Sequence, residues 1–182
     1  MNAGCYGSYV SDYFLSLRII CRNGAIKILR IEDLDFRYRG SSIPDNAIVT
    51  EVTFKSIKEE PENIAMKMNR ALEYRELHQP VKELSCGSTF RNPLGRSSSM
   101  DPGDTDHSLK AWKLIDEAGL RGMKVGGAQI STKHPNFMIN TGNATAQNLE
   151  DLGSLVIKKV KEKSGIELLW EIKRVGLNAQ EV

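Results

Sequence analysis

A hydroxyl, a guanidinium and an amide follow closely behind one glycine in the segment Ser85-Cys86-Gly87-Ser88-Thr89-Phe90-Arg91-Asn92-Pro93. Gly87 can take backbone angles that are closed to other residues, and it leaves room for a ligand. Arg91 and Asn92 offer a charged fork and a neutral amide to an anionic or amide-bearing substrate, and Ser88 could donate a proton. The chain has no G-x-S-x-G motif, which disfavours a hydrolase nucleophile. These residues are also typical of a solvated turn at a strand end, so the segment alone leaves both interpretations open.

Strands are expected in the N-terminal part of the chain. Apolar and β-branched residues fill positions 15–21 and again 25–29, and Asn23-Gly24 between them is a pair that a tight turn accepts at positive φ. This pattern predicts a β-hairpin. Residues 48–54 alternate between two faces and predict a half-buried strand. Arg39 then lies in the loop between the hairpin and this strand.

A helix is expected from Pro61 toward Leu77, with Pro80 ending it. Apolar residues recur along it at helical spacing, so Met66 and Met68 are interpreted as core filler and not as a ligand surface.

A mobile surface loop is expected over residues 95–106, because nearly all of them are turn formers. The next helix is expected from about Ser108 to Gly119, with Trp112 in the core. A strand should run through residues 137–139.

The last helix is expected to start at the N-cap Thr145, to bury an apolar stripe at spacings of three to four, and to end by Gly165. A strand is expected to follow through residues 166–175. Strands and helices in this order predict an α+β architecture.

The composition excludes several classes of protein. A chain of 182 residues with 40% hydrophobic residues can bury a good core. A net charge of +2 is too mild to indicate a nucleic-acid or membrane partner, and the lysines near residue 160 are interpreted as a solvated helix end. No run approaches the roughly 20 apolar residues of a membrane span. A soluble, cytoplasmic protein is expected.

Neither a disulfide framework nor a metal site is indicated. Cys5, Cys21 and Cys86 are odd in number and lack C-x-x-C spacing, which fits a reducing cytosol. The three histidines lie far apart in the sequence without metal-ligand spacing, so structural roles are expected for them.

Several motifs, in the right order, resemble the MurB family, the UDP-N-acetylenolpyruvoylglucosamine reductases of bacterial cell-wall synthesis. Gly87-Ser88 and its neighbours resemble the family's serine motif. The further matches are Met1-Asn2-Ala3-Gly4-Cys5-Tyr6-Gly7 to an Asn-x-Gly-x-Tyr-Gly run, Phe36-Arg37-Tyr38-Arg39-Gly40-Ser41 to a Tyr-Arg-x-Ser motif, and Trp170-Glu171-Ile172-Lys173-Arg174-Val175-Gly176 to a C-terminal Glu strand. Residues 125–131, 137–140 and 142–146 also resemble the family.

The resemblance implies an oxidoreductase in which NADPH reduces bound FAD, and the flavin reduces the enolpyruvyl double bond of a UDP-sugar. It assigns Arg39 to the substrate carboxylate, Ser88 to proton donation, and Glu171 to a neutral carboxyl that donates a hydrogen bond. Without the resemblance, Arg39 would be interpreted as a surface ion-pair residue, and Glu171 as an exposed strand residue paired with Lys173 or Arg174.

The same resemblance implies that Tyr6, Arg91 and Asn92 meet the UDP-sugar. It also implies that Gly4, Tyr6 and Gly7 are the remnant of a flavin-contacting run. No P-loop or G-x-G-x-x-G is present, so no independent phosphate cradle is indicated.

In the MurB family the Asn-x-Gly-x-Tyr-Gly run lies well inside the chain, whereas here it begins at Met1. The resemblance therefore implies that an N-terminal FAD-binding segment is missing. A truncated product, a misassigned start and one piece of a split enzyme remain open. The expected domains are the remnant of a PCMH-type FAD-binding domain (1–57), a linking helix (58–80) and a MurB C-terminal substrate-binding domain (81–182). The alternative to a reductase is an inactive fragment or a UDP-sugar-binding module that cannot hold FAD by itself.

Overall fold

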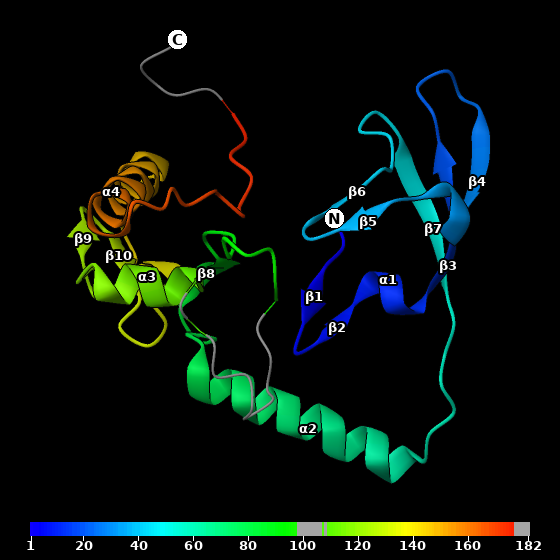
Figure 1. The fold of residues 1–182 in the computed structure, drawn as a ribbon, viewed down its shortest axis with the longest axis horizontal. Helices are drawn as coiled ribbons and strands as arrows, with labels where there is room; N and C mark the ends of the chain where they lie inside the picture. The colour runs from blue at the N-terminus through cyan, green and yellow to red at the C-terminus, as the bar shows by residue number, and fades with distance from the viewer. Residues whose placement is uncertain (98–106, 108, 177–182) are drawn as a thin grey trace. The chain divides into compact units, whose positions relative to one another are not determined.

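The computed structural model describes residues 1–97, 107 and 109–176. The chain forms two compact units, coloured from blue to cyan and from green to red in Figure 1. Unit 1 comes from Met1–Glu60 and Gly95–Thr105, and unit 2 from Pro61–Leu94 and Asp106–Val182. Most of the loop expected over residues 95–106 lies outside the described residues. The mixture of helices and strands confirms the α+β prediction.

Unit 1 is built mainly from short antiparallel strands. Its elements are β1 (Gly4–Cys5), β2 (Ser8–Tyr9), α1 (Val10–Tyr13), β3 (Phe14–Ile20), β4 (Ile26–Arg30), the 3-10 helix η1 (Ile31–Asp33), β5 (Phe36–Arg37), β6 (Gly40–Ser41) and β7 (Ile48–Phe54). β3 lies between β4 and β7, and β1 pairs with β2 and β5 with β6.

The expected hairpin is present as β3 and β4, with Ile20 opposite Ile26. The amide of Gly24 donates to the carbonyl of Cys21 at 2.9 Å, and Gly24 has a φ of 80°. Asn23 was also expected to accept positive φ, but Gly24 alone takes it. Asn23 instead accepts a hydrogen bond from the amide of Ala25 through its side chain.

Only the central strand β3 of this sheet has buried residues, whereas most of β4 and all of β7 are exposed. Phe14, Leu17 and Ile19 of β3 form a small core with Leu34. The prediction that β7 is half-buried is wrong, because every residue of β7 is exposed. The physical reason is that no described element packs over β7, which forms one edge of the sheet.

Unit 2 combines three helices with a four-stranded antiparallel sheet. Its elements are α2 (Pro61–His78), β8 (Leu84–Ser88), α3 (Ala111–Glu117), β9 (Lys124–Val125), β10 (Ala128–Ile130), β11 (Phe137–Asn140) and α4 (Ala146–Ser164). The strand order is β8–β11–β10–β9. α4 packs against β9, β10 and β11, and α3 packs against α4 (Figure 1).

α4 follows its prediction closely. The Thr145 side chain accepts a hydrogen bond from the amide of Asn148 at 3.1 Å, which caps the first turn. Gly165 ends the helix at a φ of 74°. Leu152, Val156 and Val160 are fully buried in the main core of unit 2, whereas the lysines of the last turns are exposed, as expected.

Three predictions about unit 2 need correction. Met66 and Met68 are exposed, since no residue of α2 is buried, so they are not core filler. Trp112 is half-buried, and its ring contacts the imidazoles of His107 and His134 at centroid distances of 5.6 and 6.5 Å. α3 begins at Ala111, later than expected, and Ser108 lies outside the described residues.

The strand expected over residues 166–175 is also absent. Only one antiparallel bridge forms there, between Trp170 and Phe90. The pairing does not extend into a strand, and the Trp170 ring packs against α4 at Gly153. Within the described residues, no helix has the length and apolar character needed to cross a membrane.

Candidate active site

Ser88 ends β8, opposite Phe137 of β11, and it is half-buried. Directly before it, Gly87 has a φ of 90°, and the pairing of β8 with β11 shifts register at this point. A residue with a Cβ would be strained here, so the glycine allows the bulge that precedes the serine.

The chain after Ser88 is hydrogen-bonded on both sides. On one side, the amide of Thr89 donates to the carbonyl of Asn136 at 2.8 Å. On the other side, the amide of Arg91 donates to the carbonyl of Leu169, and that of Glu171 to the carbonyl of Thr89, each at 2.8 Å. Residues 89–91 therefore form a fixed segment between residue 136 and residues 169–171.

Glu171 is half-buried and lies outside any regular strand. The strand around it was therefore wrongly predicted, although its amide does join the segment after Ser88. Arg174, one of the partners considered for Glu171, lies 3.6 Å from Glu150 and places its guanidinium over the Trp170 ring.

Arg91 and Asn92 differ in their surroundings. The Oδ1 of Asn92 accepts a hydrogen bond from the amide of Ala111 at 3.0 Å, at the first turn of α3. One end of the Asn92 amide therefore has a structural task. The Nε of Arg91 is buried and has no hydrogen-bond partner among the described residues. A buried guanidinium donor without a partner is costly unless a ligand or water bonds it.

In unit 1, Arg39 lies in the tight turn between β5 and β6 at a φ of 51°. Its Nη1 donates to the Oγ of Ser97 at 3.3 Å, and its guanidinium lies 4.8 Å from the centre of the Tyr38 ring. Arg37, the neighbouring arginine, lays its side chain over Gly40. The arginine assigned by the resemblance is thus the one held in an uncommon backbone conformation.

Tyr6 lies in the turn between β1 and β2 at a φ of 53°, followed by Gly7 at 81°. Gly7 supplies the backbone angle of the turn. A Cβ on Gly4 would overlap the ring of Tyr9, so Gly4 allows the two strands to pack. Among the described residues, Tyr6 and Arg39 are the non-glycine residues with positive φ.

Positive φ costs an ordinary residue about 1–2 kcal/mol, and such residues cluster at functional sites. Both residues with this conformation in unit 1 are therefore candidates for function on geometric grounds alone. This signal is independent of the motif resemblance that first singled them out.

Ser97, which no sequence motif singles out, connects the two turns. It is buried, its amide donates to the Oη of Tyr9 at 3.1 Å, and its Oγ donates to the carbonyl of Gly4 at 3.0 Å. Because the same Oγ accepts from Arg39, Ser97 joins the β1–β2 hairpin to the arginine turn.

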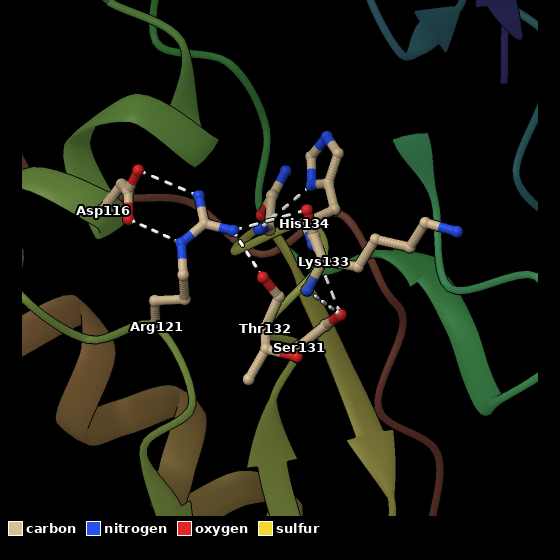
Figure 2. A network of polar contacts seen from close by, with 7 residues as sticks. Asp116, Arg121, Ser131, Thr132, Lys133 and His134 are labelled. Atoms are coloured by element: carbon tan, nitrogen blue, oxygen red, sulfur yellow. Dashed lines mark hydrogen bonds and ion pairs between the residues drawn. The ribbon is translucent and has the colours of Figure 1, made fainter. Parts of the chain in front are cut away.

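A polar network supports the residue 131–134 turn that precedes β11 in unit 2, and Figure 2 shows it from close by. Arg121 forms a two-pronged ion pair with Asp116, at 2.8 and 2.9 Å, and its Nη1 donates to the carbonyl of Thr132 at 2.6 Å. Hydrogen bonds from Arg121 hold the pKa of Asp116 below its usual value. The pair thereby links the end of α3 to the turn.

His134 closes this turn. Its amide donates to the Oγ of Ser131, and its Nδ1 accepts a hydrogen bond from the amide of Asn136 at 3.2 Å. Burial lowers the pKa of His134 to about 4, so the ring is neutral at pH 7 with its proton on Nε2. The ring packs edge-on against Phe137, the residue paired with Ser88.

Each unit also has a hollow near its candidate residues. In unit 1, a hollow of about 620 Å³ lies beside the β1–β2 hairpin and is lined in part by Gly4, Tyr9, Tyr13 and Phe54. In unit 2, one of about 490 Å³ is lined by Gly87, Phe137 and the C-terminal part of α2, among others. Across the described part of the chain, no group of three acidic, histidine or cysteine side chains could hold a metal ion.

Residues 79–175 match the protein family described as UDP-N-acetylenolpyruvoylglucosamine reductase, C-terminal domain. This match covers more than half of the 182 residues. The chain belongs to this family. The MurB resemblance of the motifs is therefore confirmed, and unit 2, with Ser88 and Glu171, holds most of the matching stretch.

Relatives of this reductase family extend the similarity to nearly the whole chain. The chain is 51% identical to the UDP-N-acetylenolpyruvoylglucosamine reductase of Paracoccus denitrificans, and 52% identical to that of Ruegeria pomeroyi, over 176 residues in each case. Both alignments cover 97% of this chain but 57% of the relative. The chain thus spans little more than half the length of these curated relatives.

The fold is similar to a crystal structure of UDP-N-acetylenolpyruvylglucosamine reductase (MurB) from Thermus caldophilus. The TM-score is 0.73 at 34% sequence identity, and the match covers 94% of this chain and 57% of that chain. Both units therefore have a MurB fold. The α+β class and the presence of the MurB C-terminal domain are confirmed.

Proposed function

We propose that the chain acts as a MurB reductase, which converts UDP-N-acetylglucosamine enolpyruvate to UDP-N-acetylmuramate in peptidoglycan synthesis, in the cytoplasm. One observation carries the proposal beyond family membership. The segment after Ser88 is hydrogen-bonded to the segment of Glu171. Two residues distant in the sequence therefore belong to neighbouring, hydrogen-bonded segments. The relatives named as reductases of this substrate support the same conclusion.

Ser88 is proposed to donate the proton that completes the reduction. When bound, FAD supplies the hydride, having received it from NADPH. The substrate carbon that becomes negative is then far more basic than an alcohol, which makes a serine an adequate acid. The fixed segment after Ser88 would hold its hydroxyl toward that carbon.

Arg39 and Glu171 are proposed to hold the substrate carboxylate. A planar guanidinium can bond both carboxylate oxygens and stabilise the negative charge that develops on them. Glu171 would do so as a neutral carboxyl that donates a hydrogen bond.

Tyr6, Arg91 and Asn92 are proposed to contact the UDP-sugar. The buried Nε of Arg91 offers a donor that a phosphate or carbonyl oxygen could accept. The oxygen of the Asn92 amide also accepts a hydrogen bond from the amide of Ala111, which ties this proposed contact residue to the first turn of α3.

The residues of the β1–β2 hairpin fit a flavin in part. The hollow beside Gly4 has an aromatic and largely apolar lining, which suits a planar ring, and Tyr6 and Gly7 lie in the turn of the same hairpin. Gly4, Tyr6 and Gly7 are therefore the residues of this chain that we propose to contact FAD.

A second candidate function is a UDP-sugar-binding module that cannot hold FAD by itself. The open sheet of unit 1 favours it, because Ile26, Ile48 and Phe54 are all more than half exposed. Apolar side chains on the face and edge of a sheet usually pack against a further element.

The experiment that tests the reductase begins with the 182-residue chain and added FAD, followed by gel filtration. A retained flavin spectrum is expected, followed by bleaching with NADPH and recovery with the enolpyruvyl sugar. A chain that binds the sugar but retains no flavin would support the second candidate instead.

The role of Ser88 is tested in the same two half-reactions. With Ser88→Ala, reduction by NADPH should persist, whereas reoxidation by the sugar should fall by at least about 100-fold, as expected for a lost proton donor. Ser154→Ala, at an exposed position of α4, is the control and should behave as wild type. Equal loss of both half-reactions would contradict the proton-donor role.

A further inference from the structure

Asn136 is a polar residue in the interior of unit 2. It is 4% exposed and directly precedes β11. A buried amide costs free energy unless its donors and acceptors are bonded, so its hydrogen bonds indicate its task. Apart from the bond to His134 within its own turn, the hydrogen bonds of Asn136 go to Thr89 and Phe90.

Three hydrogen bonds connect Asn136 to Thr89 and Phe90. Its Oδ1 accepts from the amide of Phe90 at 3.0 Å, and its Nδ2 donates to the carbonyl of Phe90 at 2.8 Å. Its own carbonyl accepts from the amide of Thr89 at 2.8 Å. The side chain thus bonds both main-chain groups of one residue, as a neighbouring strand would.

The main chain of Ser88 lies opposite Phe137 of β11, and the bonds of Asn136 hold the two residues on its C-terminal side. On the other side lies the Gly87 bulge, where an added Cβ would meet no atom within 4 Å. Phe90 is 1% exposed, so its amide and carbonyl lie in the interior and lose their side-chain partners if Asn136 is removed. They would have to shift to find other partners, and Ser88 would shift with them.

We propose that Asn136 is a positioning residue that fixes the direction of the Ser88 hydroxyl through Thr89 and Phe90. The proposal rests on the proposed function insofar as Ser88 donates a proton. A displacement of about 1 Å at a reacting group can cost about 100-fold in rate, so the loss of Asn136 should reduce proton transfer without removing any atom that touches the substrate.

The test uses Asn136→Ala and, in case that variant folds poorly, Asn136→Asp, which keeps the size of the side chain and loses the donor to Phe90. The matched control is Asn148→Ala. Asn148 also bonds main-chain amides in unit 2, those of Thr145 and Gly127, and neither bond involves the Ser88 segment. The control reports the effect of losing a structural asparagine.

Two measurements are made on each variant. The first is the rate of flavin reoxidation by the enolpyruvyl sugar, compared with flavin reduction by NADPH. The second is hydrogen exchange at the amides of residues 88–90, compared with the rest of unit 2. We expect reoxidation to fall by about 10- to 100-fold for the Asn136 variants with reduction unchanged. We also expect amide exchange at Thr89 and Phe90 to rise well above that of the control.

Two results would overturn the positioning role. One is exchange that rises evenly across unit 2, as in the control, which would mean that Asn136 contributes only general stability. The other is a locally faster exchange with normal reoxidation. If the wild-type chain performs neither half-reaction, the proposed function fails, and the exchange measurement still decides whether Asn136 holds the Ser88 main chain.

Discussion

The amide of Glu171 donates a hydrogen bond to the carbonyl of Thr89 across 2.8 Å. This contact places the chain of one proposed catalytic residue beside the chain that directly follows the other, Ser88. The neighbouring pair is Phe90 and Trp170, whose ring centres lie 5.0 Å apart. This pairing requires that the Trp170 ring can pack against α4.

Gly153 of α4 provides that space, and Gly153→Ala should therefore destabilise unit 2. An added Cβ would overlap the Trp170 ring, so the ring and the Glu171 segment would have to move. We expect a loss of about 1–3 kcal/mol in the free energy of unfolding, even though alanine favours a helix over glycine by about 1 kcal/mol. Chemical denaturation of the purified variant measures this loss.

Ser154→Ala is the control, because Ser154 is exposed in the same helix and should tolerate alanine. A Gly153→Ala variant more stable than wild type would show that the Trp170 ring does not need this space.

Local sequence signals predicted α4 because its cap at Thr145, its buried stripe and its stop at Gly165 all lie within the helix itself. The strand expected over residues 166–175 failed for the opposite reason. Its apolar residues satisfy a strand pattern, but their partners are Phe90 and α4, which are far away in the sequence. Ser97 and Asn136 could not be selected from the sequence for the same reason, because nearly all of their hydrogen bonds are to residues far away in the sequence.

The positive φ of Arg39 should make glycine more stable than alanine at this position. Arg39→Gly and Arg39→Ala both remove the guanidinium, so their difference reports the backbone alone. Arg39→Gly should be more stable than Arg39→Ala by about 1 kcal/mol, because alanine is strained at a φ of 51°. Both should lose reductase activity. Thermal unfolding of unit 1 measures the difference.

The same pair of substitutions at Arg22, an exposed turn residue whose φ is not positive, is the control. There alanine should be at least as stable as glycine. If glycine were more stable than alanine at both positions, the result would contradict backbone strain at Arg39.

Unit 2 should lose stability as the pH falls from 6.5 toward 4. The pKa of His134 is lowered to about 4 in the folded protein by burial, and the charges of Arg121 and His78 contribute. The unfolded chain therefore binds the proton first, and the loss of stability within this window is at most about 3 kcal/mol. Protonation also removes the acceptor that Nδ1 offers to the amide of Asn136.

Denaturation curves at several pH values check this expectation. His134→Gln should flatten the dependence above pH 4, whereas His78→Gln, which removes a smaller contribution than burial, should leave most of it in place. Asp116 acts at lower pH, because its folded pKa is lowered by Arg121 and its contribution is lost as the pH falls through that value. A stability that stays constant between pH 6.5 and 4.5 would argue against a buried neutral His134.

The open face of unit 1 should promote self-association. Ile20 pairs with Ile26 on one side and Ile48 on the other, so the three form an apolar row across the sheet. Ile26 and Ile48 are 65% and 67% exposed and lie on the two edge strands. Ile26→Lys should reduce association, because a charged edge residue disfavours edge-to-edge pairing.

Sedimentation velocity over a range of concentrations measures this association. Leu77→Lys, which changes an equally exposed apolar residue of α2, is the control and should have no effect. A wild-type chain that stays monomeric throughout the range would contradict the prediction.

Product formation tests the proposed reductase activity most directly. The 182-residue chain is incubated with FAD, NADPH and UDP-N-acetylglucosamine enolpyruvate, and the sugar nucleotide is analysed by mass spectrometry. We predict a product heavier by two hydrogen atoms that requires both FAD and NADPH and is lost with Arg39→Ala and Ser88→Ala. Unchanged substrate in the presence of flavin-loaded chain would contradict the claim.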